Sequence, residues 1–140
     1  MVEDFQRYKI KDYTYWTVFL HRNQCYLGRV YIWAKREDAI DFMEMTPEER
    51  EELFYVGQAV NKALGDLFQP DLMNYAALGN IETHLHLHVI PRYINHRIFD
   101  KVRFVDSRWG KNYAPYNYDF KIPEVTLLKL RNAIREKLDI

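Results

Sequence analysis

Three histidines alternate with leucines over one short segment, His84-Leu85-His86-Leu87-His88. Successive side chains of a β-strand point to opposite faces, so a strand here would place the three imidazoles on one face and the leucines on the other. Neighbouring imidazoles would then lie roughly 6 to 7 Å apart, which suits adjacent atoms of one phosphate chain. Because the reference pKa of histidine is about 6.5, one ring can act as a neutral nucleophile while another donates a proton. The pattern therefore favours phosphoryl transfer.

Two other interpretations of this histidine cluster (His84, His86 and His88) stay open. The rings could be the solvated face of an edge strand, although three of the five histidines in the chain lie here. They could also bind catalytic zinc, for which three imidazoles and one open position are suitable ligands. Side chains on one face of a flat strand diverge, however, and three of them reach one ion at about 2.1 Å only if the strand bends. We therefore expect no metal site.

Length, charge and cysteine content limit the class of protein. The 140-residue chain, 48% hydrophobic, has room for one domain with a sizeable core. Its formal net charge is zero, so no overall field would draw it to a nucleic acid polymer or a membrane surface. Cys25 is the only cysteine, which excludes an intrachain disulfide and a multi-cysteine zinc site. With neither a basic, apolar leader nor an apolar run of about 18 residues, we expect a soluble, cytoplasmic protein.

Four segments have the β-branched and aromatic composition of strands. They are residues 13–20, 29–33, 72–78 and 84–90. Residues 21–28 should connect the first two as a hairpin. Gly79 and Asn80, both good turn formers, should connect the last two. We expect the last strand, which carries the histidine cluster, to lie beside the first hairpin.

Two helices are indicated. Thr46, Pro47 and Glu49 supply an N-cap, a proline suited to the first helical position and the acid of a capping box, so a helix should run from Pro47 to about Phe68. Apolar residues recur in it at three- and four-residue steps and should pack on a sheet: Leu53, Val56, Val60, Leu64 and Leu67. Pro123 opens a similar C-terminal pattern. Residues 94–122, called the flap below, show no periodicity and should be ordered but mostly irregular.

The segment His84-Leu85-His86-Leu87-His88-Val89-Ile90-Pro91-Arg92 resembles the signature of the histidine-triad (HIT) family. Phe19, His21 and residues 28–32 resemble its first nucleotide-binding hairpin, and residues 45–49 resemble the start of its central helix. The resemblance covers about residues 13–93. It implies an α+β fold with an antiparallel sheet, a long central helix and a C-terminal helix, assembled as a homodimer. The short segment 74–80 resembles a microbial branch of dinucleoside-polyphosphate hydrolases.

The resemblance implies a role for each histidine of the cluster. His86 would attack the α-phosphorus and form a nucleotidyl-imidazole intermediate, a covalent step that a neutral imidazole can perform. The ring nitrogen of His86 that does not react would donate to the backbone carbonyl of His84, which fixes the tautomer. His88 would donate to the bridging or leaving-group oxygen. The His84 side chain would support the site from behind.

Further residues are expected to bind substrate by the same resemblance. Asn74 would donate to an α-phosphate oxygen and Asn80 to the leaving group, while His21 would bond ribose hydroxyls and Phe19 would stack on the base. Turn chemistry is the competing interpretation for the two asparagines, and a structural role competes for His21 and Phe19. His21 stands where the family has an acid or asparagine, and Arg29 stands where it often has a histidine, so the nucleoside is not specified.

The flap is locally basic and aromatic. Such a segment could hold the distal phosphates or a second nucleoside, and Arg92 and Trp109 are the candidates for those contacts. The competing interpretation is that the charges are solvated and cover a small aromatic core.

These expectations define one HIT-like domain over residues 1–140, with a core at about 13–93 and the flap and last helix in 94–140. It would be a nucleotide hydrolase or nucleotidyl transferase acting at the α-phosphate of dinucleoside polyphosphates or nucleoside phosphoramidates. No cofactor is required by the residues themselves, although Mg²⁺ can accompany a polyphosphate substrate. The alternative is a non-catalytic nucleotide- or zinc-binding regulator that uses the same pocket.

Overall fold

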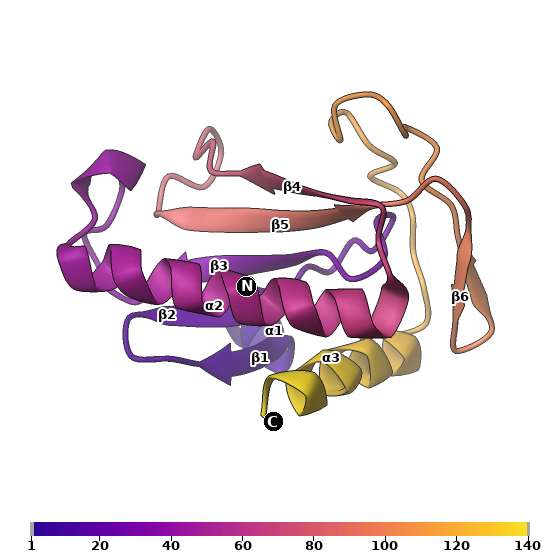
Figure 1. The fold of residues 1–140 in the computed structure, drawn as a ribbon, viewed down its shortest axis with the longest axis horizontal. Helices are drawn as coiled ribbons and strands as arrows, with labels where there is room; N and C mark the ends of the chain where they lie inside the picture. The colour runs from indigo at the N-terminus through magenta and orange to yellow at the C-terminus, as the bar shows by residue number, and fades with distance from the viewer. Residues whose placement is uncertain (1, 140) are drawn as a thin grey trace.

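Five strands form one antiparallel sheet in the order β1-β2-β3-β5-β4 in the computed structural model, which describes residues 2–139. The strands are β1 (Lys9–Asp12), β2 (Trp16–Leu20), β3 (Val30–Ala34), β4 (Leu72–Ala76) and β5 (His86–Arg92). Figure 1 shows the long helix α2 (Pro47–Phe68) crossing in front of this sheet, with α3 (Glu124–Leu138) packed against α2 and beside β1. The expected α+β fold and the strand order around the histidine cluster are confirmed.

Helix α2 begins where the sequence predicts. The Thr46 hydroxyl accepts a hydrogen bond from the Glu49 backbone N–H, and the Glu49 carboxylate accepts one from the Thr46 N–H, which completes the capping box. The helix ends at Phe68, and Gln69 follows in the left-handed conformation. Of the predicted apolar face, four residues are buried and Leu67 is partly buried. This face holds α2 against the sheet.

Strands β3 and β5 alternate between a core face and an open face. Val30, Ile32 and Ala34 of β3 are fully buried, whereas the aromatic residues between them are half-buried. On the segment of the histidine cluster, Leu85 and Val89 are buried in the core, and the three histidines are half-buried. The predicted division between leucines in the core and histidines on the open face is confirmed.

Several predicted strand boundaries differ from the structure. The segment 13–20 is a strand only from Trp16, because the preceding residues form the turn that connects it to β1, where Tyr13 N–H bonds to the Trp16 carbonyl. Neither β1 nor the short helix α1 (Val2–Arg7) was predicted. Strand β5 starts at His86 and continues through Pro91. Proline is tolerated there because β3 pairs no further than Val89, so no ladder bond from β3 needs its missing N–H.

The flap contains more regular structure than expected. Strands β6 (Arg97–Phe99) and β7 (Val102–Phe104) form a separate two-stranded hairpin. Its turn has positive φ at Asp100 and Lys101, a conformation that favours Asn and Gly. Because the turn contains neither of these residues, its sequence did not indicate a turn. The 3-10 helix η1 (Phe42–Glu44) was likewise not predicted. The remainder of the flap is irregular, as expected.

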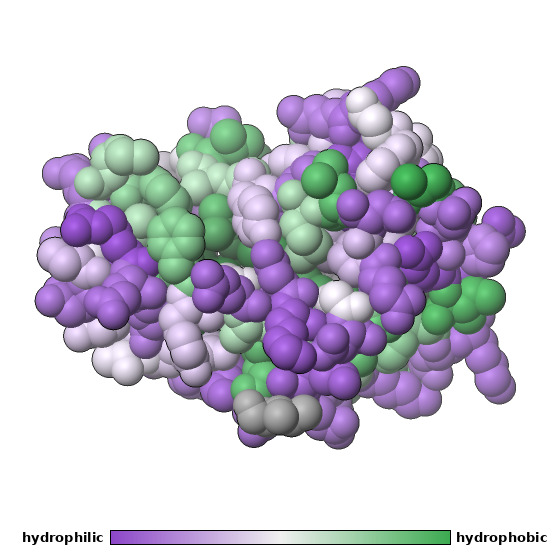
Figure 2. Space-filling view, in the orientation of Figure 1, coloured by the Kyte–Doolittle hydropathy of each residue, from purple (hydrophilic) through white to green (hydrophobic). Residues whose placement is uncertain are grey.

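The apolar core draws on residues from both ends of the described chain. It runs from Tyr8 in the loop before β1 to Leu138 at the end of α3. Figure 2 shows apolar surface at the upper left, over η1 and above the left end of α2, and along the β4 side. The exposed apolar residues of η1, α2 and β4 include Met43, Phe54, Leu72 and Tyr75. No helix within residues 2–139 is long and apolar enough to cross a membrane.

Replacing the helix cap should destabilise the fold by a small, measurable amount. Thr46→Ala removes the hydroxyl that accepts from Glu49 N–H, and we expect the free energy of unfolding to fall by about 1 kcal/mol. Urea denaturation measures the change. Thr83→Ala, in the exposed loop before β5, is the matched control and should leave stability within about 0.5 kcal/mol of wild type. Equal losses in the two variants would contradict the capping role.

Candidate active site

The register between β3 and β5 places the imidazoles of the cluster among aromatic rings. Tyr31 pairs with His88 and Trp33 pairs with His86. The His86 and His88 rings lie 4.9 Å apart between centroids and are nearly perpendicular. The Tyr31 ring is 6.2 Å from His86 and 6.0 Å from His88. The two histidines therefore point from one face of the sheet, and their rings lie closer together than the roughly 6 to 7 Å expected from the strand repeat.

The tautomer of His86 is fixed by the backbone. Its Nδ1 lies 2.6 Å from the carbonyl oxygen of His84, and because a carbonyl only accepts, Nδ1 carries the proton and donates. The neutral ring then has its lone pair on Nε2. This is the hydrogen bond that the family resemblance implied. It leaves His86 with one nucleophilic nitrogen in a defined position.

His84 lies before the start of β5, and its ring packs against residues of β3. Its Nε2 is 2.6 Å from the carbonyl oxygen of Ala34 and donates to it. The ring stacks on Trp33 with centroids 4.3 Å apart and planes 20° from parallel. Trp33 also stacks on His86 at 5.5 Å. A supporting position for His84, expected from the resemblance, agrees with these contacts.

His88 lies beside a guanidinium. Arg29 Nη2 is 3.4 Å from His88 Nδ1, and since arginine can only donate, Nδ1 accepts and the neutral ring carries its proton on Nε2. Burial, together with the positive charge of Arg29 and the neighbouring His86, lowers the pKa of His88 to about 3. At neutral pH His88 is therefore a neutral hydrogen-bond donor through Nε2.

His21 joins the cluster from the end of β2. Its ring is 5.7 Å from His88 and 6.2 Å from Tyr31, and its Nδ1 accepts from the Asn23 backbone N–H. Burial and Arg29 hold the pKa of His21 well below its usual range. The buried Gln24 ties the loop together, because its amide bonds the carbonyls of His21 and Arg29 and accepts from the Gly28 N–H.

Arg92 is the polar centre of the neighbouring region. It pairs with the buried Asp106 through Nε at 2.7 Å and Nη2 at 3.1 Å. It also donates to Asn74 Oδ1 and to the carbonyls of Arg108 and Lys111. These bonds occupy the five N–H donors of a guanidinium. Arg92 thus has no donor left for a phosphate in this conformation, and it orients Asn74 so that the Asn74 Nδ2 remains available to donate.

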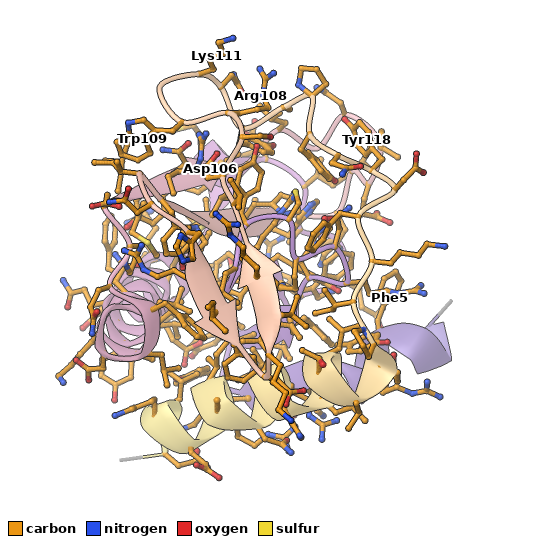
Figure 3. The ribbon with its side chains drawn as sticks, turned by 90° about the vertical axis from the view of Figure 1, so that its right-hand side faces the viewer. Phe5, Asp106, Arg108, Trp109, Lys111 and Tyr118 are labelled. Carbon is orange, nitrogen blue, oxygen red and sulfur yellow. The ribbon has the colours of Figure 1, made fainter. Side chains whose placement is uncertain are left out.

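A cavity of about 280 Å³ lies between β4 and the flap, lined by Leu72, Asn74, Arg92, Trp109, Gly110 and Lys111. Figure 3 shows Asp106 at the base of this part of the flap, with Trp109 and Lys111 further out. The structure thus places Asn74 and Trp109 in the lining of one cavity, and their roles as substrate contacts stay predictions. Phe19 is buried and stacks on Tyr31 at 5.3 Å. Asn80 lies in the exposed loop between β4 and β5.

Sequence reasoning missed the aromatic part of the site. Tyr31 and Trp33 were considered only as strand residues, although their alternation with Val30 and Ile32 was the available signal. Tyr113 and Tyr116 of the flap lie with their ring centroids 5.4 and 4.7 Å from the Arg29 guanidinium. No pattern in the flap indicated that contact. Within residues 2–139, no group of three His, Cys, Asp or Glu side chains is arranged to hold a metal ion.

The family model of the HIT domain matches residues 6–95, which is more than half of the chain. The chain belongs to the HIT domain family. The match spans the first hairpin, α2 and the complete histidine cluster, so the resemblance expected from the motif is confirmed at the level of the family. A comparison of the sequence with curated proteins finds no match.

Solved structures share this HIT fold. The histidine triad protein from Bradyrhizobium japonicum has a TM-score of 0.77 and 20% identity, over 96% of this chain and 94% of that one. A histidine triad protein from Sinorhizobium meliloti gives 0.78 and 22%, over 96% and 93%. A hypothetical histidine triad nucleotide-binding protein from Sulfolobus tokodaii gives 0.71 and 18%, over 94% and 83%. At these identities the likeness establishes the fold alone.

The low pKa of His88 predicts a loss of stability in acid. Histidine titrates at about 6.5 in the unfolded chain but at about 3 in this folded site, so the unfolded state binds the proton first. The free energy of unfolding should be highest above about pH 6.5 and fall by about 1.4 kcal/mol per pH unit below it for this histidine. His21 contributes in the same direction.

Urea denaturation at pH 7.5 and 5.5 measures this dependence on wild type, His88→Asn and His96→Asn. The exposed His96 serves as the control and its variant should keep the wild-type difference between the two pH values. His88→Asn should show a smaller difference. An unchanged difference in His88→Asn would mean that His88 is not held neutral by the fold.

Breaking the buried ion pair should cost more than breaking a surface pair. Asp106→Ala leaves Arg92, whose side chain is 3% exposed, without its counter-ion, and we expect a loss of about 3 to 5 kcal/mol in the free energy of unfolding. Asp66→Ala removes the exposed partner of Lys62 and should cost about 0.5 kcal/mol or less. Thermal unfolding of both variants tests the contrast, which similar melting temperatures would refute.

Proposed function

We propose that this HIT protein is a nucleotide hydrolase or nucleotidyl transferase that acts at the α-phosphate of a nucleotide conjugate. The candidate substrates are dinucleoside polyphosphates and nucleoside phosphoramidates. The observation that carries the proposal is the hydrogen bond from His86 Nδ1 to the His84 carbonyl at 2.6 Å. It fixes the one tautomer in which Nε2 has a free lone pair.

The first step in this proposal is attack by His86 Nε2 on the α-phosphorus. The bond from phosphorus to the leaving group breaks, and its electron pair departs with that group, leaving a nucleotidyl group on His86. His88 donates a hydrogen bond from Nε2 to the departing atom. Water or another acceptor then attacks the phosphorus and regenerates the free imidazole.

The surrounding residues are suited to hold the substrate. The Nδ2 amide of Asn74 supports the negative charge that develops on an α-phosphate oxygen, because Arg92 holds the other end of the amide in place. The cavity beside Asn74 is lined in part by Trp109, whose ring is suited to contact the remainder of the conjugate. In this proposal Mg²⁺ accompanies polyphosphate substrates and is not a resident group of the site.

Product analysis of wild type and His86→Ala tests the proposal. Each is incubated with dinucleoside polyphosphates and nucleoside phosphoramidates, in EDTA and in Mg²⁺, and the products are separated by chromatography. We expect wild type to release nucleoside monophosphate and His86→Ala to retain less than about one-thousandth of that rate. His96→Ala is the control and should match wild type. An unimpaired His86→Ala enzyme would exclude the covalent mechanism.

The same panel distinguishes a binding protein from an enzyme. Calorimetric titration with each nucleotide, and with Zn²⁺, reports affinity without turnover. Binding by wild type with no product from any substrate would favour the regulator and contradict the proposed activity. Product formation with a nucleotide covalently attached to His86, detected by mass spectrometry of acid-free digests, would favour the enzyme.

For the assembly we propose a homodimer that uses the outer strand of the sheet. Strand β4 is the last strand in the order β1-β2-β3-β5-β4, and its outer edge has no partner within residues 2–139. Leu72 and Tyr75 on this strand are exposed, which is a hazard for a monomer. Analytical ultracentrifugation of wild type should give the mass of two chains, and Tyr75→Lys should shift it to one. A monomeric wild type would exclude the dimer.

A further inference from the structure

Arg29 is a buried cation without a counter-ion. It directly precedes β3, is 2% exposed and forms no salt bridge within the described chain. Its Nε and Nη1 have no hydrogen-bond partner, and its Nη2 lies 3.4 Å from His88 Nδ1. Burying a guanidinium without a carboxylate is costly, and proteins otherwise pair such charges. A structural role alone would be served better by an apolar residue, so the charge itself needs an explanation.

The guanidinium is enclosed by aromatic rings. The Tyr116 ring centroid is 4.7 Å from Arg29 Cζ and that of Tyr113 is 5.4 Å away, so the negative faces of these rings stabilise the cation. The flap is held over Arg29 in part by the hydrogen bond from the Tyr26 hydroxyl to the Tyr113 carbonyl. Aromatic faces do not cancel a full charge as a carboxylate does. The positive potential of Arg29 therefore acts on the neighbouring imidazole.

None of the ionisable groups that face His88 compensates the positive potential of Arg29. His86 lies on the same strand, His21 comes from the end of β2 and Tyr31 from β3, and β4 contributes only Ala76 opposite His88. None of these groups is a carboxylic acid. Within residues 2–139, no Asp or Glu side chain hydrogen-bonds to Arg29 or His88. Protonating His88 would place a second positive charge against Arg29, and the pKa of His88 is lowered accordingly.

We infer that Arg29 makes the site selective for substrates whose leaving group departs as an anion, so that phosphoanhydrides are preferred to phosphoramidates of basic amines. Arg29 acts here as a positioning residue, through His88. The inference rests on the proposed function and narrows its substrate class to one of the two candidates.

The chemistry of the two leaving groups differs in its need for a proton. When His86 attacks a phosphoanhydride, the P–O bond breaks and its electron pair remains on a phosphate oxygen. That oxygen is stable as an anion and is stabilised further by the Nε2–H of His88 and the charge of Arg29. When His86 attacks a phosphoramidate, the departing nitrogen needs a proton. A neutral His88 would have to become an imidazolate to supply it, and Arg29 opposes the imidazolium that could supply it readily.

Kinetics with two substrates of the same nucleoside measure the selectivity. The ratio of kcat/KM for the dinucleoside polyphosphate to that for the phosphoramidate is compared in wild type, Arg29→Met and Arg103→Met. Wild type should prefer the anhydride, and Arg29→Met should lower the ratio by about tenfold or more. Arg103, exposed on β7, is the matched control and its variant should keep the wild-type ratio. A wild-type preference for the phosphoramidate, or an unchanged ratio in Arg29→Met, would overturn the inference.

Nitrogen-15 NMR of the histidine side chains tests the same contact without turnover. In wild type, His88 should carry its proton on Nε2 and remain neutral from pH 7.5 to pH 5; in Arg29→Met its titration should move toward the ordinary histidine range. A protonated Nδ1, or ordinary titration of His88 in wild type, would overturn the inference even if Arg29→Met does not fold. If wild type releases no nucleotide from any substrate but His88 stays neutral with its proton on Nε2, the proposed function is wrong. The effect of Arg29 on His88 is then still supported, whereas the selectivity built on turnover is not.

Discussion

The pairing of β3 with β5 is the constraint on which the site depends. Because the side-chain period of a strand is two, a slip of one residue would turn His86 and His88 into the core and expose Leu87 and Val89. The observed register sets Tyr31 opposite His88 and Trp33 opposite His86. It is held by fully buried apolar side chains on one face and by stacked rings on the other. The register between β3 and β5 thus determines both the packing of the core and the geometry of the site.

Two buried guanidiniums lie close to the site, and their surroundings give them opposite electrostatic effects. Arg92 is neutralised by Asp106, and all its donors are occupied, so its role is to orient groups. Arg29 has aromatic faces and an imidazole as its neighbours, so its charge is felt by the site. The two arginines therefore contribute in different ways. The sequence had suggested Arg92 as a substrate contact and had marked Arg29 as a departure from the family pattern, but it indicated neither set of surroundings.

Local signals predicted the parts of the structure that local interactions determine. The capping box predicted the start of α2, and the alternation from Leu85 to Val89 predicted the two faces of the histidine segment. The hydrogen bond between His86 and the His84 carbonyl followed from the family motif. The contacts of Arg29 and Arg92 could not be predicted in this way, because each joins a strand to residues of the flap far along the chain. Asp106 and Tyr116 have no periodic pattern around them, and only the folded chain shows that they are neighbours of these arginines.

The five hydrogen bonds of Arg92 make the flap and β4 one cooperative unit. The guanidinium joins the Asn74 amide to backbone carbonyls at Arg108 and Lys111, so the flap cannot peel away locally without leaving buried donors unsatisfied. Opening of this segment is then coupled to the orientation of an amide on the sheet. Sequence changes on the outer surface of the flap would consequently alter the cavity between β4 and the flap through the backbone, while leaving the histidines untouched.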